Sequence, residues 1–121
     1  MNRMSHAHAI VAALILTGAR LANAHAHPTQ QAPSAGQTLA SAPREVAIDF
    51  DEDVEAAFTS IAVTDAQGHS VIDGKTAVAA GRGTHVSVAL KTLAPGTYSV
   101  TWVAVAKDGH RTQGRYAFTV K

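Results

Sequence analysis

The sequence predicts an all-β protein, either an antiparallel, immunoglobulin-like β-sandwich or a small Greek-key β-barrel. Apolar and polar residues alternate in several short runs, as they do in strands that bury only one face. These runs recur at spacings of about 8–12 residues with turn-forming residues between them, and none has a helical period. The chain has 121 residues and no cysteine, so we expect one small domain without disulfide bonds.

Residues 1–26 predict a secretory signal peptide. Arg3 supplies a positive charge, an apolar run follows from Ala9 to Ala19, and small residues come after it. A membrane-spanning helix needs about 20 apolar residues, so this run is too short to serve as an anchor. We therefore expect an exported domain of residues 27–121 with no membrane span after processing.

Two overlapping Ala-x-Ala patterns leave the position of the cut open. Cutting after Ala24 would expose His25-Ala26-His27, whereas cutting after Ala26 would expose His27-Pro28, and we favour the second. The mature chain then has one more acidic than basic residue. It offers no clustered basic face of the kind that nucleic acid requires.

The expected strands lie in the C-terminal two thirds of the chain. Residues 29–43 are rich in small and polar residues and predict an extended arm or loop, which Leu39 pins to the core. The alternating runs that follow predict strands at 44–50, 58–64, 75–79, 84–90, 98–105 and 116–120, with a short return strand beginning at 71–72. Turn residues separate them, most clearly at 66–69, 81–83 and 93–97.

The loop expected from Asp108 to Gly114 carries two metal-binding side chains. Asp108 and His110 are two residues apart, so both can point at one metal ion. Asp and Gly are also common turn residues, so this pair does not establish a metal site by itself. The histidine that export would expose supplies further nitrogen donors for the same ion.

Taken together, these features resemble the CopC family of periplasmic copper-resistance proteins. The resemblance covers essentially all of the mature chain. It implies a Greek-key barrel or sandwich of about seven antiparallel strands that binds Cu(II) at one end. It rests on the His27-Pro28 start, the strand 43–50 with Asp51-Glu52-Asp53 after it, the Leu93-Ala94-Pro95-Gly96-Thr97-Tyr98 turn, Trp102, the Asp108-Gly109-His110 loop and the closing Gly114-Arg115-Tyr116-Ala117-Phe118.

The resemblance implies a Cu(II) site made by His27, Asp108 and His110. His27 would bind through its amine and its ring, and Glu52 matches a residue sometimes placed near the metal. Such nitrogen and oxygen donors suit the tetragonal plane that Cu(II) prefers. Some members also hold Cu(I) on a methionine-rich loop, but both methionines of this chain lie in the expected signal peptide. We therefore expect Cu(II) alone.

The two possible cuts predict different copper chemistry at the N-terminus. After a cut following Ala26, Pro28 has no amide hydrogen to give up, so the metal cannot be wrapped by amides beyond His27. After a cut following Ala24, His27 would be the third residue. Free amides would precede it, and a local square-planar chelate could form without help from the fold. The mass of the mature protein separates the two cases.

The leading prediction is a periplasmic protein that is not an enzyme and that buffers or carries copper for homeostasis or resistance. The resemblance also implies a partner, an inner-membrane copper transport protein of the CopD type. One alternative is a copper-dependent oxidative enzyme of the lytic polysaccharide monooxygenase type, although Asp108 would occupy the position that oxygen needs. The other is a metal-free immunoglobulin-like interaction module, since a fold does not fix a function. Hydrolase and nucleotide-binding motifs are not found in the sequence.

Overall fold

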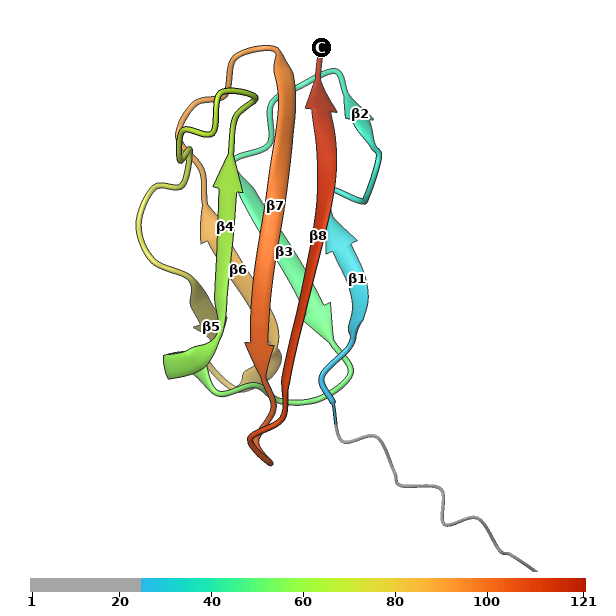
Figure 1. Cartoon of the computed structure of the whole chain (residues 1–121). Coiled ribbons are helices and arrows are strands. Elements are labelled where there is room, and N and C mark those ends of the chain that lie inside the picture. Colours follow the sequence, from blue (N-terminus) through green and yellow to red (C-terminus); the bar gives the residue numbers. More distant parts are fainter. Residues whose placement is uncertain (1–24) are drawn as a thin grey trace, which may run out of the picture.

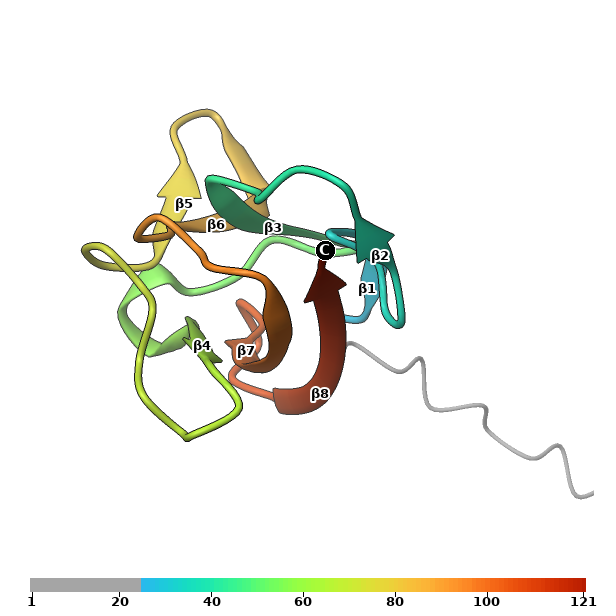
Figure 2. The same ribbon diagram turned by 90° about the horizontal axis from the view of Figure 1, so that it is seen from above.

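Two four-stranded sheets face each other in the computed structural model, which describes residues 25–121 (Figures 1 and 2). The expected signal peptide lies outside this range except for its last two residues. One sheet has the order β1-β3-β6-β5 and the other β2-β8-β7-β4. The strands are β1 (Pro28–Ala32), β2 (Thr38–Leu39), β3 (Glu45–Phe50), β4 (Ser60–Thr64), β5 (Ala77–Ala79), β6 (Arg82–Ala89), β7 (Gly96–Val105) and β8 (Arg111–Val120).

The predicted all-β sandwich is confirmed, and the sheets do not close into a barrel. Neighbouring strands are antiparallel except β2 and β8, which run parallel. The described residues form eight strands rather than about seven, together with one 3-10 helix, η1 (Ala56–Phe58). No helix within residues 25–121 combines the length and the apolar character needed to cross a membrane.

The core lies between the sheets and follows the alternation of the sequence. In β3, Val46, Ile48 and Phe50 are buried, while the residues between them are at least partly exposed. Phe50 packs edge-on against Trp102 of β7, with ring centroids 5.4 Å apart. This contact joins the two sheets near the end of the sandwich where β3 and β7 finish.

The prediction of an arm or loop over residues 29–43 is wrong in its secondary structure. This segment supplies an edge strand to each sheet, β1 to one and β2 to the other. In β1, Gln30 pairs with Asp49 and Gln31 with Ile48. An edge strand is held by backbone hydrogen bonds along one side and need not carry an apolar face, so the polar composition concealed it. Leu39 lies in β2 and packs partly buried against the core, as expected.

The loop expected from Asp108 to Gly114 is shorter than predicted, since β8 already begins at Arg111. Gly114 suggested a loop, but it lies within the strand opposite Trp102. A Cβ atom at Gly114 would lie 2.5 Å from Cζ2 of the Trp102 ring. The glycine is therefore explained by the close approach of the indole and not by a turn.

The return strand expected at 71–72 does not form. Ser70 and Ile72 make isolated bridges to Thr64 and Leu90, and the regular ladder resumes only at β5. The turn before them is present, with the N–H of Asp65 donating to the carbonyl oxygen of His69 at 2.9 Å. The chain therefore crosses here from one sheet toward the other instead of completing a hairpin.

Three segments distant in the sequence meet at one end of the sandwich. They are the start of β1, the loop after β3 and the turn between β7 and β8 (Figure 1). The N–H of Asp51 donates to the carbonyl oxygen of His27 at 2.9 Å, and Val54 bridges Ala106. The residues that the sequence predicts to bind the metal, His27, Asp108 and His110, all lie at this end.

Candidate metal centre

The turn between β7 and β8 holds Asp108 and His110 against each other. The His110 backbone N–H donates to Oδ1 of Asp108 at 3.0 Å, and Nδ1 of the His110 ring lies 2.8 Å from Oδ2. Gly109 between them has φ +89°, a left-handed conformation that glycine adopts without strain. The side chains are 59% exposed for His110 and 35% for Asp108, so solvent reaches both.

The pKa of Asp108 is lowered below its ordinary value of 3.8. The main cause is the hydrogen bond from the His110 backbone N–H, followed by the bond to the His110 ring, and the His25 ring adds a smaller electrostatic contribution. Asp108 is therefore an anionic oxygen donor at neutral and mildly acidic pH. The His25 ring contributes because the N-terminal segment lies beside this turn.

His25 lies beside His110. Their ring centroids are 4.7 Å apart with an interplanar angle of 64°. Nδ1 of His25 is buried and has no hydrogen-bond partner among the described residues. An unpaired buried nitrogen normally costs free energy, so such an atom calls for an explanation. A metal ion bound at Nδ1 would supply the missing partner.

His27, the N-terminal residue expected from the favoured cut, makes different contacts. Its ring is exposed, with its centroid 6.1 Å from that of His25. Its backbone N–H donates to Oδ1 of Asp51 at 2.7 Å, in the loop after β3. The contacts thus bring His25, Asp108 and His110 together, while the backbone nitrogen of His27 is held by Asp51.

Ala26, which the sequence predicts to be the last residue of the signal peptide, packs into the core. It is 0% exposed and lies in the hydrophobic core. Its carbonyl oxygen accepts a hydrogen bond of 2.7 Å from Oγ1 of Thr112 in β8. Sequence reasoning did not single out Thr112 or the contact of Asp51 with His27, because both are tertiary contacts without a local pattern.

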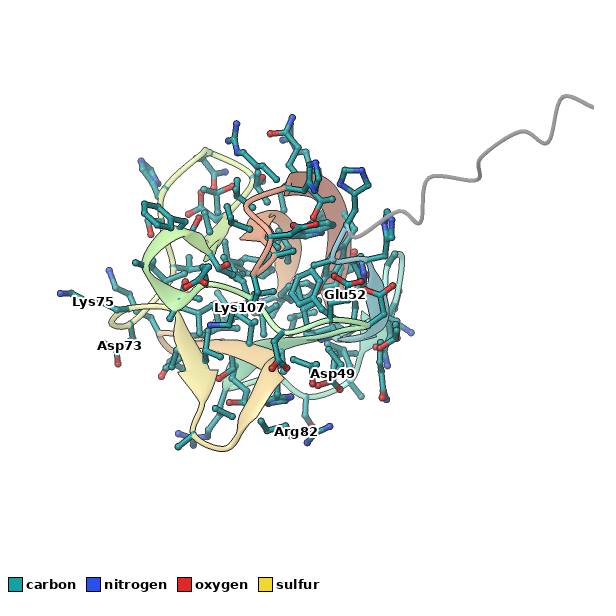
Figure 3. The ribbon with its side chains drawn as sticks, turned by 90° about the horizontal axis from the view of Figure 1, so that it is seen from below. Asp49, Glu52, Asp73, Lys75, Arg82 and Lys107 are labelled. Atoms are coloured by element: carbon teal, nitrogen blue, oxygen red, sulfur yellow. The ribbon has the colours of Figure 1, made fainter. Side chains whose placement is uncertain are left out.

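No group of three or more His, Asp or Glu side chains within residues 25–121 is already arranged to hold a metal ion. One reason is that Nδ1 of His110 faces the Asp108 carboxylate. A metal ion would therefore bind Nε2 of His110 or displace this contact. Glu52, the weaker candidate, lies half-buried in the loop after β3 (Figure 3). The donor types nevertheless fit Cu(II), which favours imidazole, amine and carboxylate ligands.

A further histidine, His85 of β6, lies on the outer face of the sheet β1-β3-β6-β5, opposite Asp49 and outside the group of His25, Asp108 and His110. Nδ1 of His85 is 2.6 Å from Oδ1 of Asp49, and Arg82 lies 3.5 Å from the same oxygen. Asp49 and Arg82 are labelled in Figure 3. This ion-pair group contains a single imidazole and serves below as a control.

Comparison with known proteins identifies the family. A sequence model of the CopC domain matches residues 28–121. The protein YobA of Escherichia coli K12 is 36% identical over 100 residues, covering 81% of this chain and 80% of YobA. The copper transport protein CutJ of Bacillus subtilis is 35% identical over 98 residues, which is 80% of this chain but only 18% of CutJ.

Two solved structures share the fold. CopC from Methylosinus trichosporium OB3b is 32% identical with a TM-score of 0.75, covering 80% of this chain and 94% of that one. PcoC, a methionine-rich copper resistance protein from Escherichia coli, is 29% identical with a TM-score of 0.69, covering 80% of this chain and 99% of PcoC. By the match of the domain model across residues 28–121, the chain belongs to the CopC family.

Proposed function

We propose that this chain is an exported, periplasmic Cu(II)-binding protein that buffers or carries copper. One observation carries the proposal: Nδ1 of His25, which is buried and has no hydrogen-bond partner within residues 25–121, lies next to the Asp108 and His110 pair. Three donor groups from opposite ends of the chain thus meet in a small, partly exposed region. The names of the relatives, which refer to copper resistance and copper transport, support the same conclusion.

The third ligand residue is the histidine at the mature N-terminus. The family resemblance suggested His27, with the cut after Ala26, but the contacts favour His25 and a cut after Ala24. A cut after Ala26 would remove a fully buried residue and leave the Thr112 hydroxyl without its acceptor. It would also place the new amine at Asp51 instead of at the turn between β7 and β8.

The proposed ligands complete a plane of three nitrogens and one oxygen. The amine and Nδ1 of His25 close a chelate around Cu(II), a ring nitrogen of His110 adds the third nitrogen, and Asp108 adds the oxygen. Residues 25–121 contain neither methionine nor cysteine, in contrast to the methionine-rich PcoC. Without soft sulfur ligands a tight Cu(I) site is not expected, so the proposed cargo is Cu(II) alone.

We further propose that the domain delivers copper to a membrane transport protein of the CopD type and is not an enzyme. The match to CutJ supports this, because a related domain there occupies a small part of a longer copper transport protein. If a related domain is attached to a transporter in one protein, a separate domain can supply a transporter in another.

A copper titration of the exported protein tests the proposal. Trp102, the single tryptophan of the chain, lies in β7 at the metal end and reports binding through quenching of its fluorescence by Cu(II). We expect saturation at one equivalent in the wild type. His110→Ala should lose most of the affinity, whereas His85→Ala should bind like the wild type. A wild-type protein that does not bind Cu(II), or equal binding by His110→Ala, contradicts the proposal.

A further inference from the structure

The N-terminal segment and the loop after β3 are joined by two hydrogen bonds between His27 and Asp51. The His27 N–H donates to Oδ1 of Asp51 at 2.7 Å, and the Asp51 N–H donates to the His27 carbonyl oxygen at 2.9 Å. A hydrogen bond to a carboxylate is roughly twice as strong as one between neutral groups. The bond to Oδ1 is solvent-exposed, so it is not needed to satisfy a buried group.

The position of His27 gives this contact a chemical consequence. If the mature chain begins at His25, then His27 is its third residue. The terminal amine, the amide nitrogens of Ala26 and His27, and the His27 ring can together enclose Cu(II) or Ni(II) in a square plane. Each amide releases its hydrogen to solvent as its metal–nitrogen bond forms. This local chelate uses the same amine as the proposed site and therefore competes with it.

The fold holds the N-terminal segment in a conformation that opposes the local chelate. The His27 N–H points at Asp51, and the Ala26 carbonyl oxygen is held by Thr112. Ala26 is fully buried, so its peptide groups cannot turn toward a metal without leaving the core. A local chelate would have to break the bond from His27 to Asp51 and the bond from Thr112 to Ala26, and it would have to expose Ala26.

We infer that Asp51 is a positioning residue that keeps the His27 amide away from the metal and so directs Cu(II) to His25, Asp108 and His110. The inference rests on the proposed function and on a mature chain that begins at His25. Asp51 does not touch the metal in this account. It selects between two coordination modes that share one amine.

Visible absorption and electron paramagnetic resonance spectra of the Cu(II)-loaded, exported protein test the inference. The reference for the local chelate is the peptide His-Ala-His-Pro with Cu(II). We expect the wild-type spectrum to differ from that of the peptide. Asp51→Ala should shift the visible band to shorter wavelength, toward the peptide. Asp51→Asn, which keeps an oxygen acceptor for the His27 N–H, should retain the wild-type spectrum, and Asp53→Ala controls for lost negative charge in the same loop.

A second measurement compares the folded and the unfolded wild type. Unfolding the wild type in urea removes the contact with Asp51, so the Cu(II) spectrum should then match that of the peptide. Ni(II) should give the yellow, square-planar complex only with the unfolded protein or with Asp51→Ala.

Two results would overturn the inference and leave the proposed copper function in place: a spectrum of folded Asp51→Ala that equals the wild type, or a yellow, square-planar Ni(II) complex in the folded wild type. A mature protein whose mass shows that the chain begins at His27 would overturn the inference together with the proposed His25 ligand. A wild type whose Trp102 fluorescence does not respond to Cu(II) overturns the proposed function itself.

Discussion

The hydroxyl of Thr112 in β8 donates a hydrogen bond of 2.7 Å to the carbonyl oxygen of Ala26, 86 residues earlier in the chain. Thr112 is the second residue after His110, so this bond fixes the N-terminal segment beside the turn that carries Asp108. Together with the contact between the His25 and His110 rings, it connects the two parts of the proposed copper site.

Replacing Thr112 with valine removes this connection and keeps the shape of the side chain. A hydrogen bond of this kind contributes about 1 kcal/mol net, so we expect Cu(II) affinity to fall by roughly fivefold as the N-terminal segment becomes less ordered. Thr119→Val is the control, because Thr119 lies in the same strand and its hydroxyl is 3.3 Å from that of Thr97. Equal affinity losses in the two variants would contradict a specific role for Thr112.

Copper affinity should fall steeply below about pH 6, because the N-terminal amine and both imidazoles bind only when unprotonated. Asp108 is not expected to limit binding there, since hydrogen bonds from His110 lower its pKa. The contribution of ionised Asp108 to the stability of the folded protein is present above the ordinary pKa of 3.8, and it is lost only as the pH falls through the lowered pKa. Titrations between about pH 7.5 and 5 test this, and a flat affinity would argue against the amine and histidine ligands.

Removing the hydroxyl group should change the free energy of unfolding differently at the two tyrosines. The Tyr98 hydroxyl donates to the Ala94 carbonyl oxygen at 2.5 Å, so Tyr98→Phe should cost about 1 kcal/mol of the free energy of unfolding. The Tyr116 hydroxyl is buried without a hydrogen-bond partner among the described residues, and burial raises the pKa of Tyr116 to about 12. Tyr116→Phe should therefore be neutral or stabilising. Urea unfolding followed by Trp102 fluorescence measures both, and a large loss in Tyr116→Phe would show a partner for that hydroxyl.

Gly114→Ala should destabilise the sandwich, because the added methyl group would lie 2.5 Å from the Trp102 ring. Overpacking of this kind costs roughly 1–3 kcal/mol. The native emission of Trp102 should shift as the indole moves. Gln113→Ala, at the exposed neighbouring position, provides the control and should leave both the stability and the emission unchanged. An unchanged emission spectrum in Gly114→Ala would mean that the backbone yields instead of the ring.

The sequence predicted best those elements that the core dictates. The alternation of Val46, Ile48 and Phe50 located β3 within one residue, since a half-buried strand leaves a period of two. Residues 29–43 were misread because edge strands are held by backbone bonds that leave no apolar pattern. For the proposed site, the sequence indicates the two candidate donors that are close together in the chain, Asp108 and His110. It could not indicate the proposed choice of His25 over His27, because that choice depends on the burial of Ala26 and on the contacts of Thr112 and Asp51.

The central claim is that export frees a histidine whose amine and ring meet Asp108 and His110 around one Cu(II) ion. A crystal structure of the exported protein loaded with copper, with the metal located by its anomalous scattering, tests it most directly. The account predicts a chain that begins at His25 and one copper ion bound to the amine and Nδ1 of His25, to Asp108 and to His110. Copper bound elsewhere, or a first residue whose amine does not reach this turn, would contradict it.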